Sequence, residues 1–394
     1  MFKYNTSWRT GVKKRVMVLS GSRAEYGLLK PVMKEIYNHQ SLKMDIIIGG
    51  MHLSGEFGSS EKEIVKDGFK IRGRVEMNPE SDSGFSMVVA IGKGMTGVAK
   101  ILKEIKPDIF LVLGDRHEAL AGTIAAGYMN IPVAHIHGGD SARAGLDESA
   151  RHAITKFAHI HFPATKKSAK RILKLGEDPW RVFPVGSPAL DAVISSKLLS
   201  KKEIKDKFKL SLEKPYIIVV QHSVTTEPEK AGSQMVETLE AVKKIGYETV
   251  IVYPNSDAGG REIIKIIKRY ESLPFIRVFK NLAQLHYLSL LKYGTVLVGN
   301  SSSGIIEAPS LKLPAINIGI RQENRERSCN VIDVAHKRNE IVKAIRGVLC
   351  NKNFIEKIKK NKNPYGDGNS SKRIVKVLSD IKIDKKLLQK RITY

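Results

Sequence analysis

The sequence IFLVLGDRHE, residues 109–118, starts with five apolar residues and ends with acidic and basic ones. It leads into HEALAGTIAAGYM, residues 117–129, which is Ala-rich and of helical length, and then into a second apolar run, VAHI, residues 133–136. Short apolar runs separated by a helical segment are typical of parallel strands joined by a right-handed crossover. Residues 109–136 therefore predict one strand–helix–strand unit of an α/β sheet.

The same alternation extends toward both ends of the chain. A chain of 394 residues is too long for one ordinary hydrophobic core, so two domains are the natural division. The predicted fold class is α/β, with two Rossmann-like doubly wound domains facing a cleft. Further strands are expected at residues 15–20, 44–48, 159–162, 216–220, 249–252, 275–278, 295–298 and 315–318.

The Lys- and Ser-rich residues 195–213 separate the two alternating blocks and form the expected linker. We place the N-terminal Rossmann-like domain at residues 1–195, the C-terminal Rossmann-like domain at residues 212–365, and a basic C-terminal helix and tail at residues 366–394. Ligands of open parallel sheets bind outside the carboxyl ends of the strands. The candidate functional residues should therefore follow the strands directly.

The composition favours a cytoplasmic protein that does not bind a membrane. Cys329 and Cys350 match no metal or redox spacing, the first residues lack an apolar signal core, and no apolar run approaches the ~20 residues of a membrane span. The net charge of +26 raises nucleic-acid binding as an alternative. Few aromatic residues lie among the lysines, so base stacking has little support. A lysine-rich surface that suits an anionic substrate is the better interpretation.

Charged residues follow three strands of the first half. Arg23 lies in a Gly-Ser-Arg turn that can bind phosphate, with a plain tight turn as the alternative. Asp115 follows the strand of the opening stretch, where helix capping is the alternative. Asp140 ends the motif HIHGGD after the next strand, and Asp147 opens the following helix. Neighbouring strands end at one edge, so these carboxylates should share a crevice and raise one another's pKa, as acid–base chemistry requires.

Six of the eleven histidines fall within residues 117–161, among them His135 and His137 of HIHGGD. An H-x-H pair with a nearby aspartate can bind zinc, which makes a metal site the alternative interpretation. Strand histidines more often hydrogen-bond locally, although one or two of these could reach a ligand. We therefore predict no metal site.

Two strands of the second half end in polar motifs. YIIVV runs into QHSVTT, so His222 should face the cleft, although a lone strand-end histidine often serves only as a local hydrogen-bonder. TVLV runs into GNSSSGIIE, where the small residues Ser301, Ser302 and Ser303 open a helix and can cradle a diphosphate. Glu307, one turn further, is placed to accept both hydroxyls of a ribose. This motif predicts a nucleotide site and is the most specific in the chain.

Taken in chain order, the motifs resemble the hydrolysing UDP-N-acetylglucosamine 2-epimerases of sialic-acid biosynthesis, including the epimerase domain of the animal bifunctional enzyme. The resemblance extends from residue 15 to about residue 377. It implies the GT-B-like, two-Rossmann arrangement of nucleotide-sugar glycosyltransferases, with a C-terminal helix after residue 369 crossing back to the first domain. The matching segments are SGSRAEYGLLKPVMKEI, GMHLSGEFG, LVLGDRHE, HIHGGD, LDESARHAITK, QHSVTTEP, YPNSDAGG, GNSSSGIIE, NIGIRQENRER and NPYGDGNSSKRI.

The resemblance implies a reaction that needs no metal or redox cofactor. The C2 proton of the sugar is lost, UDP leaves by anti elimination, and water adds to the glycal with inversion at C2, giving N-acetylmannosamine and UDP. Asp115, Asp140 and Asp147 are the implied acid–base carboxylates, and His222 is expected beside the diphosphate and glycosidic oxygen. A UDP-linked sugar is the implied partner, and a homodimer or homotetramer the implied assembly. Residues implied to bind the nucleotide or sugar are Arg23, Arg116, Glu148, Asn255, Phe279, Ser301, Ser302, Ser303, Glu307 and Arg321.

Three departures from the family pattern lie beside the implied sugar pocket. Asp140 stands where the family usually has Glu, Ser223 where it usually has Pro, and Arg143 in a loop that is usually uncharged. The substrate therefore stays open between UDP-N-acetylglucosamine and a UDP- or GDP-linked 2,4-diacetamido-2,4,6-trideoxyglucose of the legionaminic-acid pathway. A non-hydrolysing 2-epimerase, a glycosyltransferase on the same fold and a basic nucleic-acid-associated protein stay open as well.

Overall fold

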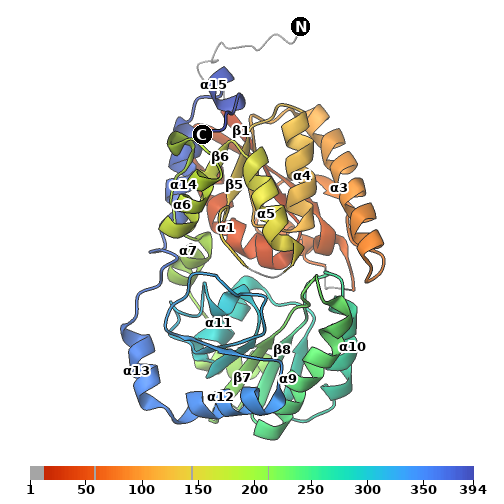
Figure 1. Ribbon diagram of the computed structural model, residues 1–394, viewed down its shortest axis with the longest axis vertical. Coiled ribbons are helices and arrows are strands. Elements are labelled where there is room, and N and C mark those ends of the chain that lie inside the picture. The colour runs from red at the N-terminus through yellow and green to blue at the C-terminus, as the bar shows by residue number, and fades with distance from the viewer. Residues whose placement is uncertain (1–12, 57–58, 143–144, 212) are drawn as a thin grey trace.

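Two six-stranded parallel sheets, one in each half of the chain, form the framework of the molecule (Figure 1). The computed structural model describes residues 13–394 except 57–58, 143–144 and 212, so Arg143 lies outside the described residues. The strand orders are β3-β2-β1-β4-β5-β6 and β9-β8-β7-β10-β11-β12. Both are the doubly wound order, which reverses between the first and fourth strands of each sheet. The predicted fold class is confirmed.

The first sheet is buried on both faces. Val16 and Val18 of β1 pack into one hydrophobic cluster, and Met17 and Leu19 pack into another on the opposite face. Parallel strands between two helix layers therefore appear in the sequence as continuous apolar runs. The strands are β1 (Lys14–Ser20), β2 (Leu42–Gly49), β3 (Ile71–Val75), β4 (Ile109–Leu113), β5 (Val133–Ile136) and β6 (Ile160–Phe162). The helices are α1 (Arg23–Asn38), η1 (Gly50–Leu53), α2 (Glu61–Lys66), α3 (Gly84–Ile105), α4 (His117–Tyr128), α5 (Leu146–Phe157), α6 (Lys166–Lys174), η2 (Pro179–Arg181) and α7 (Pro188–Ser195).

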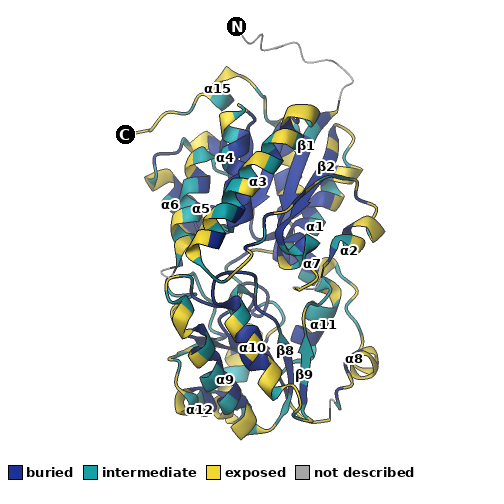
Figure 2. Ribbon diagram, turned by 90° about the vertical axis from the view of Figure 1, so that its right-hand side faces the viewer, coloured by how far each residue is buried: buried dark blue, intermediate teal, exposed yellow. Residues whose placement is uncertain are grey.

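The second sheet repeats this plan, and Figure 2 shows its strands between helices that expose only their outer sides. The strands are β7 (Tyr216–Val220), β8 (Glu248–Val252), β9 (Ile276–Phe279), β10 (Val296–Gly299), β11 (Ala315–Ile318) and β12 (Val331–Val334). The helices are α8 (Lys201–Phe208), η3 (Pro228–Lys230), α9 (Ala231–Ile245), α10 (Gly260–Tyr270), α11 (Gln284–Tyr293), η4 (Ser302–Gly304), α12 (Arg338–Cys350) and α13 (Lys352–Lys360). Two further helices, α14 (Ser370–Asp380) and α15 (Lys385–Leu388), complete the chain.

The C-terminal helix α14 returns to the first domain, as expected. Ile374 and Leu378 join the hydrophobic cluster that contains β1 and α1. The carboxylate of Asp191 on α7 accepts the backbone N–H groups of Ser370 (3.0 Å) and Ser371 (2.5 Å). A carboxylate at a helix N-terminus satisfies amides that have no partner within the helix, so α7 fixes the start of α14.

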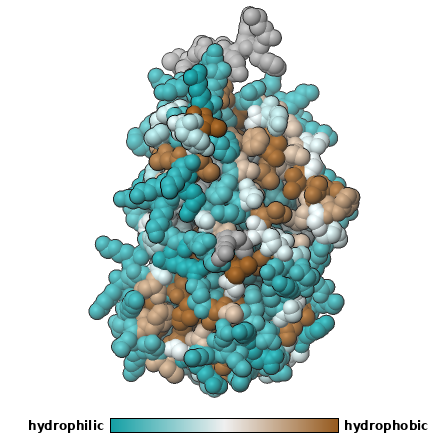
Figure 3. Space-filling model, viewed as in Figure 1, coloured by the Kyte–Doolittle hydropathy of each residue, from teal (hydrophilic) through white to brown (hydrophobic). Residues whose placement is uncertain are grey.

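Helix α3 is, within the described ranges, the helix whose length and apolar composition would suit a membrane span. One side of it, including Ala90, Gly94 and Val98, is buried in the first domain. The other side exposes Phe85 and Val88, and the brown surface over α3 and α4 in Figure 3 marks this apolar face. α3 is thus an outer helix of the first domain with an unusually apolar solvent side.

Every strand expected from the sequence is present, but two edge strands were not expected. β3 contains two arginines, and β12 is short and largely half-buried. Edge strands need not be apolar on both faces and often carry charges, so neither resembles a buried run. The expected linker also contains α8, which starts with a capping box formed by Ser200 and Glu203.

Candidate active site

The predicted motifs follow the strands at which each sheet reverses its order. β1 and β4 are neighbours in the first sheet, and β7 and β10 are neighbours in the second. Loops that leave such neighbours diverge and open a crevice at the carboxyl edge. The two crevices face each other, because ion pairs Arg116–Asp257 (3.3 Å) and Asp140–Arg325 (3.2 Å) join the domains. The candidate site is this interdomain cleft.

Asp115, at the end of β4, is ion-paired with Arg151 of α5. Arg151 is 2% exposed and also donates to Glu148 Oε2 (2.7 Å) and to the carbonyl of Asp140 (3.2 Å). Buried charges persist only when they are paired, so the ion pair with Arg151 ties Asp115 to α5. The Asp115 side chain is 21% exposed, and a ligand in the cleft can therefore reach it.

Asp140, in contrast, is enclosed by hydrogen-bond donors. One carboxylate oxygen accepts from Ser168 Oγ (2.7 Å), and the other lies 3.3 Å from His137 Nδ1 and 3.2 Å from Arg325. Burial opposes its ionisation, but the bond from His137 and the charge of Arg325 prevail and lower the pKa of Asp140 to about 2. The expectation that neighbouring carboxylates raise its pKa was wrong, because basic partners surround it.

Asp147 has the opposite environment. Burial raises the pKa of Asp147, and the nearby carboxylate of Asp257 raises it further, against the charge of Arg321. Arg321 Nη2 lies 3.5 Å from Asp147 Oδ2, and the Asp147 side chain is 26% exposed. Asp147 opens α5 in the first domain, whereas Asp257 and Arg321 belong to the second. The charges of Asp257 and Arg321 therefore act on Asp147 from across the cleft.

Arg116 lies between the two domains. Its guanidinium donates to both carboxylate oxygens of Glu118 (3.0 Å each), to Asp257 Oδ1 (3.3 Å) and to Ser256 Oγ (3.3 Å). The sequence placed Arg116 among the ligand-binding residues. In the structure it connects the loop after β4 to the loop after β8.

His222 presents one ring nitrogen to the cleft. Its Nδ1 accepts the backbone N–H of Asn255 (3.1 Å), while Asn300 accepts the N–H of His222 (2.7 Å) and donates to its carbonyl (2.9 Å). Burial, with the charge of Arg321, lowers the pKa of His222 to about 3. The ring is therefore neutral, and because Nδ1 accepts, Nε2 carries the proton. His222 can donate one hydrogen bond to an oxygen in the cleft.

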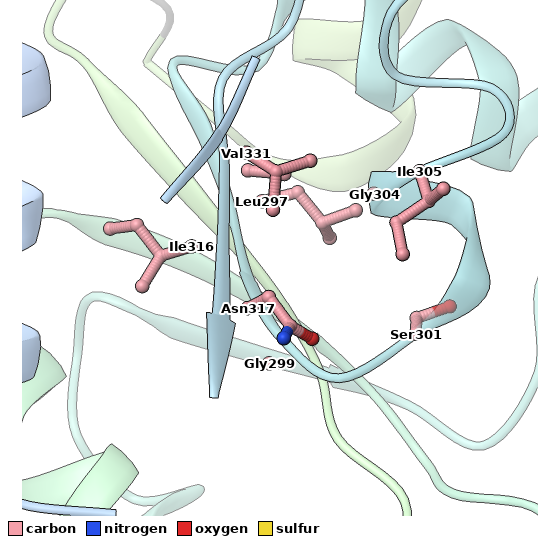
Figure 4. Close-up of a pocket in the computed structure, with 9 residues that line it drawn as sticks. Leu297, Gly299, Ser301, Gly304, Ile305, Ile316, Asn317 and Val331 are labelled. Carbon is pink, nitrogen blue, oxygen red and sulfur yellow. The ribbon is translucent and has the colours of Figure 1, made fainter. Parts of the chain in front are cut away.

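The serine motif forms a tight turn after β10. Gly299 has φ +131°, and a Cβ there would lie 2.1 Å from the carbonyl of Val220, so only glycine fits between the two strands. Ser301 accepts the N–H of Ser303 (3.3 Å), and the turn continues as the short 3₁₀ helix η4 instead of the expected α-helix. The narrow cavity behind the turn is lined mainly by apolar side chains such as Leu297 and Ile305 (Figure 4). It belongs to the interior, and the turn itself faces the cleft.

Glu307 follows this turn and is 7% exposed. Burial raises the pKa of Glu307 to about 7. The phenol of Tyr287, on α11, lies beside Ser301, Ser303 and Glu307. Tyr287 therefore joins the predicted nucleotide residues, although no pattern in the sequence distinguishes it from other core tyrosines.

Three predicted ligand-binding residues make other contacts in the structure. The ring of Phe279 packs edge-on against Phe208, with centroids 5.4 Å apart. Arg23 is paired with Glu63 of α2 (2.6 Å). Glu148 accepts from Ser141 Oγ (2.9 Å), the N–H of Ala142 (2.8 Å), Arg151 and His152, all in the first domain. Their role toward a ligand stays a prediction.

The histidines of the first domain are held by local partners. His135 Nε2 lies 2.7 Å from the carbonyl oxygen of Gly114, His137 Nε2 lies 2.8 Å from Ser187 Oγ, and His161 Nε2 lies 3.1 Å from Glu177. In the part of the chain that the structure describes, no group of three or more His, Cys, Asp or Glu is arranged to hold a metal ion. A reaction without metal or cofactor stays a prediction.

Comparison with protein families matches residues 34–379 to the family described as UDP-N-acetylglucosamine 2-epimerase. This chain belongs to that family. The polysialic acid biosynthesis protein P7 of Escherichia coli is 33% identical, over 93% of this chain and 94% of that protein. The Legionella pneumophila protein named UDP-N,N′-diacetylbacillosamine 2-epimerase (hydrolyzing) is 36% identical, over 97% of this chain and its full length.

Solved structures of UDP-N-acetylglucosamine 2-epimerases share the fold of this family member. The Neisseria meningitidis enzyme bound to UDP-GlcNAc has a TM-score of 0.76 at 22% identity, covering 92% of this chain and 99% of that one. The Methanocaldococcus jannaschii enzyme in complex with UDP-GlcNAc and UDP has a TM-score of 0.76 at 20% identity, covering 93% and 99%. At these identities the likeness establishes the two-domain fold.

In this 2-epimerase family member, sequence analysis missed three charged residues of the cleft: Arg151, Asp257 and Arg325. Each is paired with a predicted site residue, Asp115, Arg116 and Asp140 respectively. Asp257 and Arg325 reach the site from the opposite domain. A signal did exist, since all three lie inside the segments LDESARHAITK, YPNSDAGG and NIGIRQENRER.

Proposed function

We propose that this UDP-sugar 2-epimerase is a hydrolysing enzyme that converts a UDP-linked 2-acetamido sugar to UDP and the free 2-epimeric sugar. The observation that carries the proposal is the contrast between two accessible carboxylates. Asp115 is ion-paired with Arg151, whereas burial and Asp257 raise the pKa of Asp147. Groups whose environments separate their proton affinities are suited to act as base and acid.

In the proposed mechanism Asp115 takes the C2 proton. The C2–H electrons form the C1=C2 bond as the C1–O bond breaks, and UDP leaves with the bonding pair. Nε2–H of His222 and the guanidinium of Arg321 stabilise the charge that develops on the departing diphosphate. Water then adds to C1 of the glycal while Asp147 delivers a proton to C2 from the opposite face, which inverts that centre. The water loses a proton to solvent as it becomes the C1 hydroxyl. The deprotonated Asp147 recovers a proton from solvent, and Asp115 releases the proton that it took from C2 to solvent.

Two sugars are candidates for the substrate. UDP-N,N′-diacetylbacillosamine is favoured by the names of the Legionella pneumophila relative and of a Campylobacter jejuni relative that is 34% identical over 82% of this chain and 84% of that protein. UDP-N-acetylglucosamine is favoured by the family description and by a Neisseria meningitidis relative, 34% identical over 84% of this chain. The first would yield 2,4-diacetamido-2,4,6-trideoxymannose, and the second N-acetylmannosamine.

Proton NMR of the purified protein with each UDP-sugar in D₂O tests the proposal. The expected result for one of them is free UDP together with the free manno sugar, deuterated at C2. An intact UDP-linked 2-epimer would instead establish a non-hydrolysing enzyme. If neither UDP-sugar nor the GDP-linked diacetamido sugar changes, the proposed reaction is wrong.

Substituting Glu307 with Gln is expected to weaken UDP binding about 10–100-fold, because a carboxylate that accepts two ribose hydroxyls contributes charged hydrogen bonds. The pKa of Glu307 is raised to about 7, and only the ionised form accepts both bonds. Wild-type UDP affinity should therefore rise with pH through about 7, and this component should be missing in Glu307→Gln. Calorimetry at pH 6, 7 and 8 measures the UDP affinity of the wild-type protein and of Glu307→Gln. UDP itself also titrates in this range, but its titration affects both proteins equally and cancels in the comparison.

Treatment with EDTA followed by buffer exchange is expected to leave turnover unchanged, since the proposed steps use only side chains. Activity measured before and after treatment, and after addition of Zn²⁺, Mg²⁺ or Mn²⁺, checks this prediction. Loss of turnover that one of these ions restores would favour the zinc interpretation of the histidine-rich segment.

A homodimer or homotetramer in the cytoplasm, without nucleic-acid or membrane partners, remains part of the proposal. Exposed apolar side chains on adjacent helices, Phe85 and Val88 of α3 and Tyr128 of α4, support self-association.

The nucleotide-sugar partner is supported by family membership. The domain limits, residues 1–195, 212–365 and 366–394, stay a prediction.

A further inference from the structure

Arg261, at the start of α10 in the second domain, makes a dense set of contacts with the first domain. Its guanidinium donates to Glu56 Oε1 (2.9 Å) and Oε2 (3.0 Å), to Asp82 Oδ1 (3.2 Å) and to the carbonyl of Pro79 (3.1 Å). Its backbone N–H donates to Asp82 Oδ2 (3.0 Å). Asp82 therefore caps a helix of the opposite domain. Bidentate pairing of this kind fixes geometry as well as charge.

The contacts of Arg261 lie far from the covalent connections between the domains. In Figure 1, α10 stands at one side of the molecule, while α7 and α13, where the chain crosses, stand at the other. A cleft that is hinged at one side can open unless contacts at the opposite side hold the two domains together. The hydrogen bonds from Arg261 to Asp82 and Glu56 lie at that opposite side.

A hydrogen-bonded turn connects Arg261 to the candidate active site. The N–H of Gly260 donates to the carbonyl of Asp257 (2.8 Å), which closes the loop just before Arg261. Asp257 pairs with Arg116 (3.3 Å), and Asn255 of the same loop donates its N–H to His222 Nδ1 (3.1 Å). A displacement of Arg261 thus moves the groups that set the proton on Asp147 and the ring of His222.

We infer that Arg261 is a positioning residue that clasps the two domains opposite their chain crossovers and holds the loop of residues 254–260 against Arg116 and His222. The inference rests on the proposed function only for its kinetic readout. The clasp contacts no reacting atom, and it acts through the closed geometry of the cleft. Enzymes whose clefts close around substrate often depend on such contacts for kcat.

The test measures domain separation and kinetics in the full-length protein. Spin labels are attached at Lys103 and Lys268, replaced by cysteine, with Cys329 and Cys350 changed to serine. With UDP bound, the distance distribution of Arg261→Gln is expected to be longer and broader than that of the unsubstituted protein. Its kcat should fall about 10–100-fold, because misplacement of about 1 Å costs up to about 10²-fold, with a smaller change in UDP affinity. Arg261→Lys should recover part of both losses.

Arg338→Gln is the matched control. Arg338, at the start of α12, also donates its backbone N–H and guanidinium to one carboxylate, that of Glu237, but both residues lie in the second domain. Its variant should keep the wild-type distance and kcat. Asp82→Asn should reproduce the Arg261→Gln effects, and the double variant should lose little more, since both act through one contact.

The outcomes separate the clasp from the proposed reaction. Unchanged distances and kcat in Arg261→Gln would overturn the clasp, as would a fall in kcat without any change in distance. A longer distance in Arg261→Gln, in a protein that converts none of the nucleotide sugars, would support the clasp and overturn the proposed function instead.

Discussion

Asp115→Asn is expected to lower kcat by at least about 10²–10⁴-fold, the range that a positioned general base contributes, while UDP binding is largely retained. The amide has the shape of the carboxylate but cannot accept the C2 proton. The proposed nucleotide site, from Ser301 to Glu307, lies in the other domain and does not include Asp115. Release of UDP from the nucleotide sugar measures turnover, and calorimetry with UDP measures binding.

Deuterium at C2 makes this prediction specific. If Asp115 is the base, Asp115→Asn should show neither UDP release nor exchange of the C2 proton with D₂O. Asp45→Asn is the control, because Asp45 is a carboxylate of the first sheet that is likewise paired with an arginine, Arg72 (2.7 Å), but lies outside the cleft. It should lower thermal stability and leave kcat unchanged. Loss of UDP binding in Asp115→Asn, or continued exchange at C2, would contradict the assigned role.

The sequence predicts the fold well because each strand and each crossover helix of a doubly wound sheet can be identified from residues that are close together in the chain. A strand buried on both faces must be an apolar run, as in IFLVL, and the crossover must contain a helix. The strand order then places the loops after β1, β4, β7 and β10 at two reversal points. Residues such as Asp115 and His222 can consequently be assigned to one cleft before any contact is known.

The electrostatics of the cleft depend on long-range pairs that local patterns do not encode. Asp140 and Arg325 are 185 positions apart, and Arg116 and Asp257 are 141 apart. The first pair lowers the pKa of Asp140, where sequence analysis expected an increase. The partner of Phe279 was not predictable either. Its ring packs against Phe208 of α8, a helix within the residues that the sequence analysis predicted to be a linker. Positions along strands were predictable, but the partners of side chains were not.

Asp147→Asn is expected to stop the reaction halfway. Elimination needs the base Asp115 and the groups that stabilise the diphosphate, all of which remain, so UDP should still be released. Hydration needs a proton at C2 from the opposite face, which an asparagine cannot deliver. The variant should therefore accumulate the 2-acetamido glycal, and formation of the manno sugar should fall about 10²–10⁴-fold. NMR detects the vinylic C1 proton of the glycal directly.

The pH dependence of hydration supplies the companion measurement. Burial and the carboxylate of Asp257 raise the pKa of Asp147, and the acid must be protonated to act, so activity should fall as pH rises through that pKa. Asp257→Asn removes one of the two causes. It should lower the pKa of Asp147 and move the alkaline limb of the kcat profile to lower pH. An unshifted limb in Asp257→Asn, or intact nucleotide sugar in Asp147→Asn, would mean that another group protonates C2.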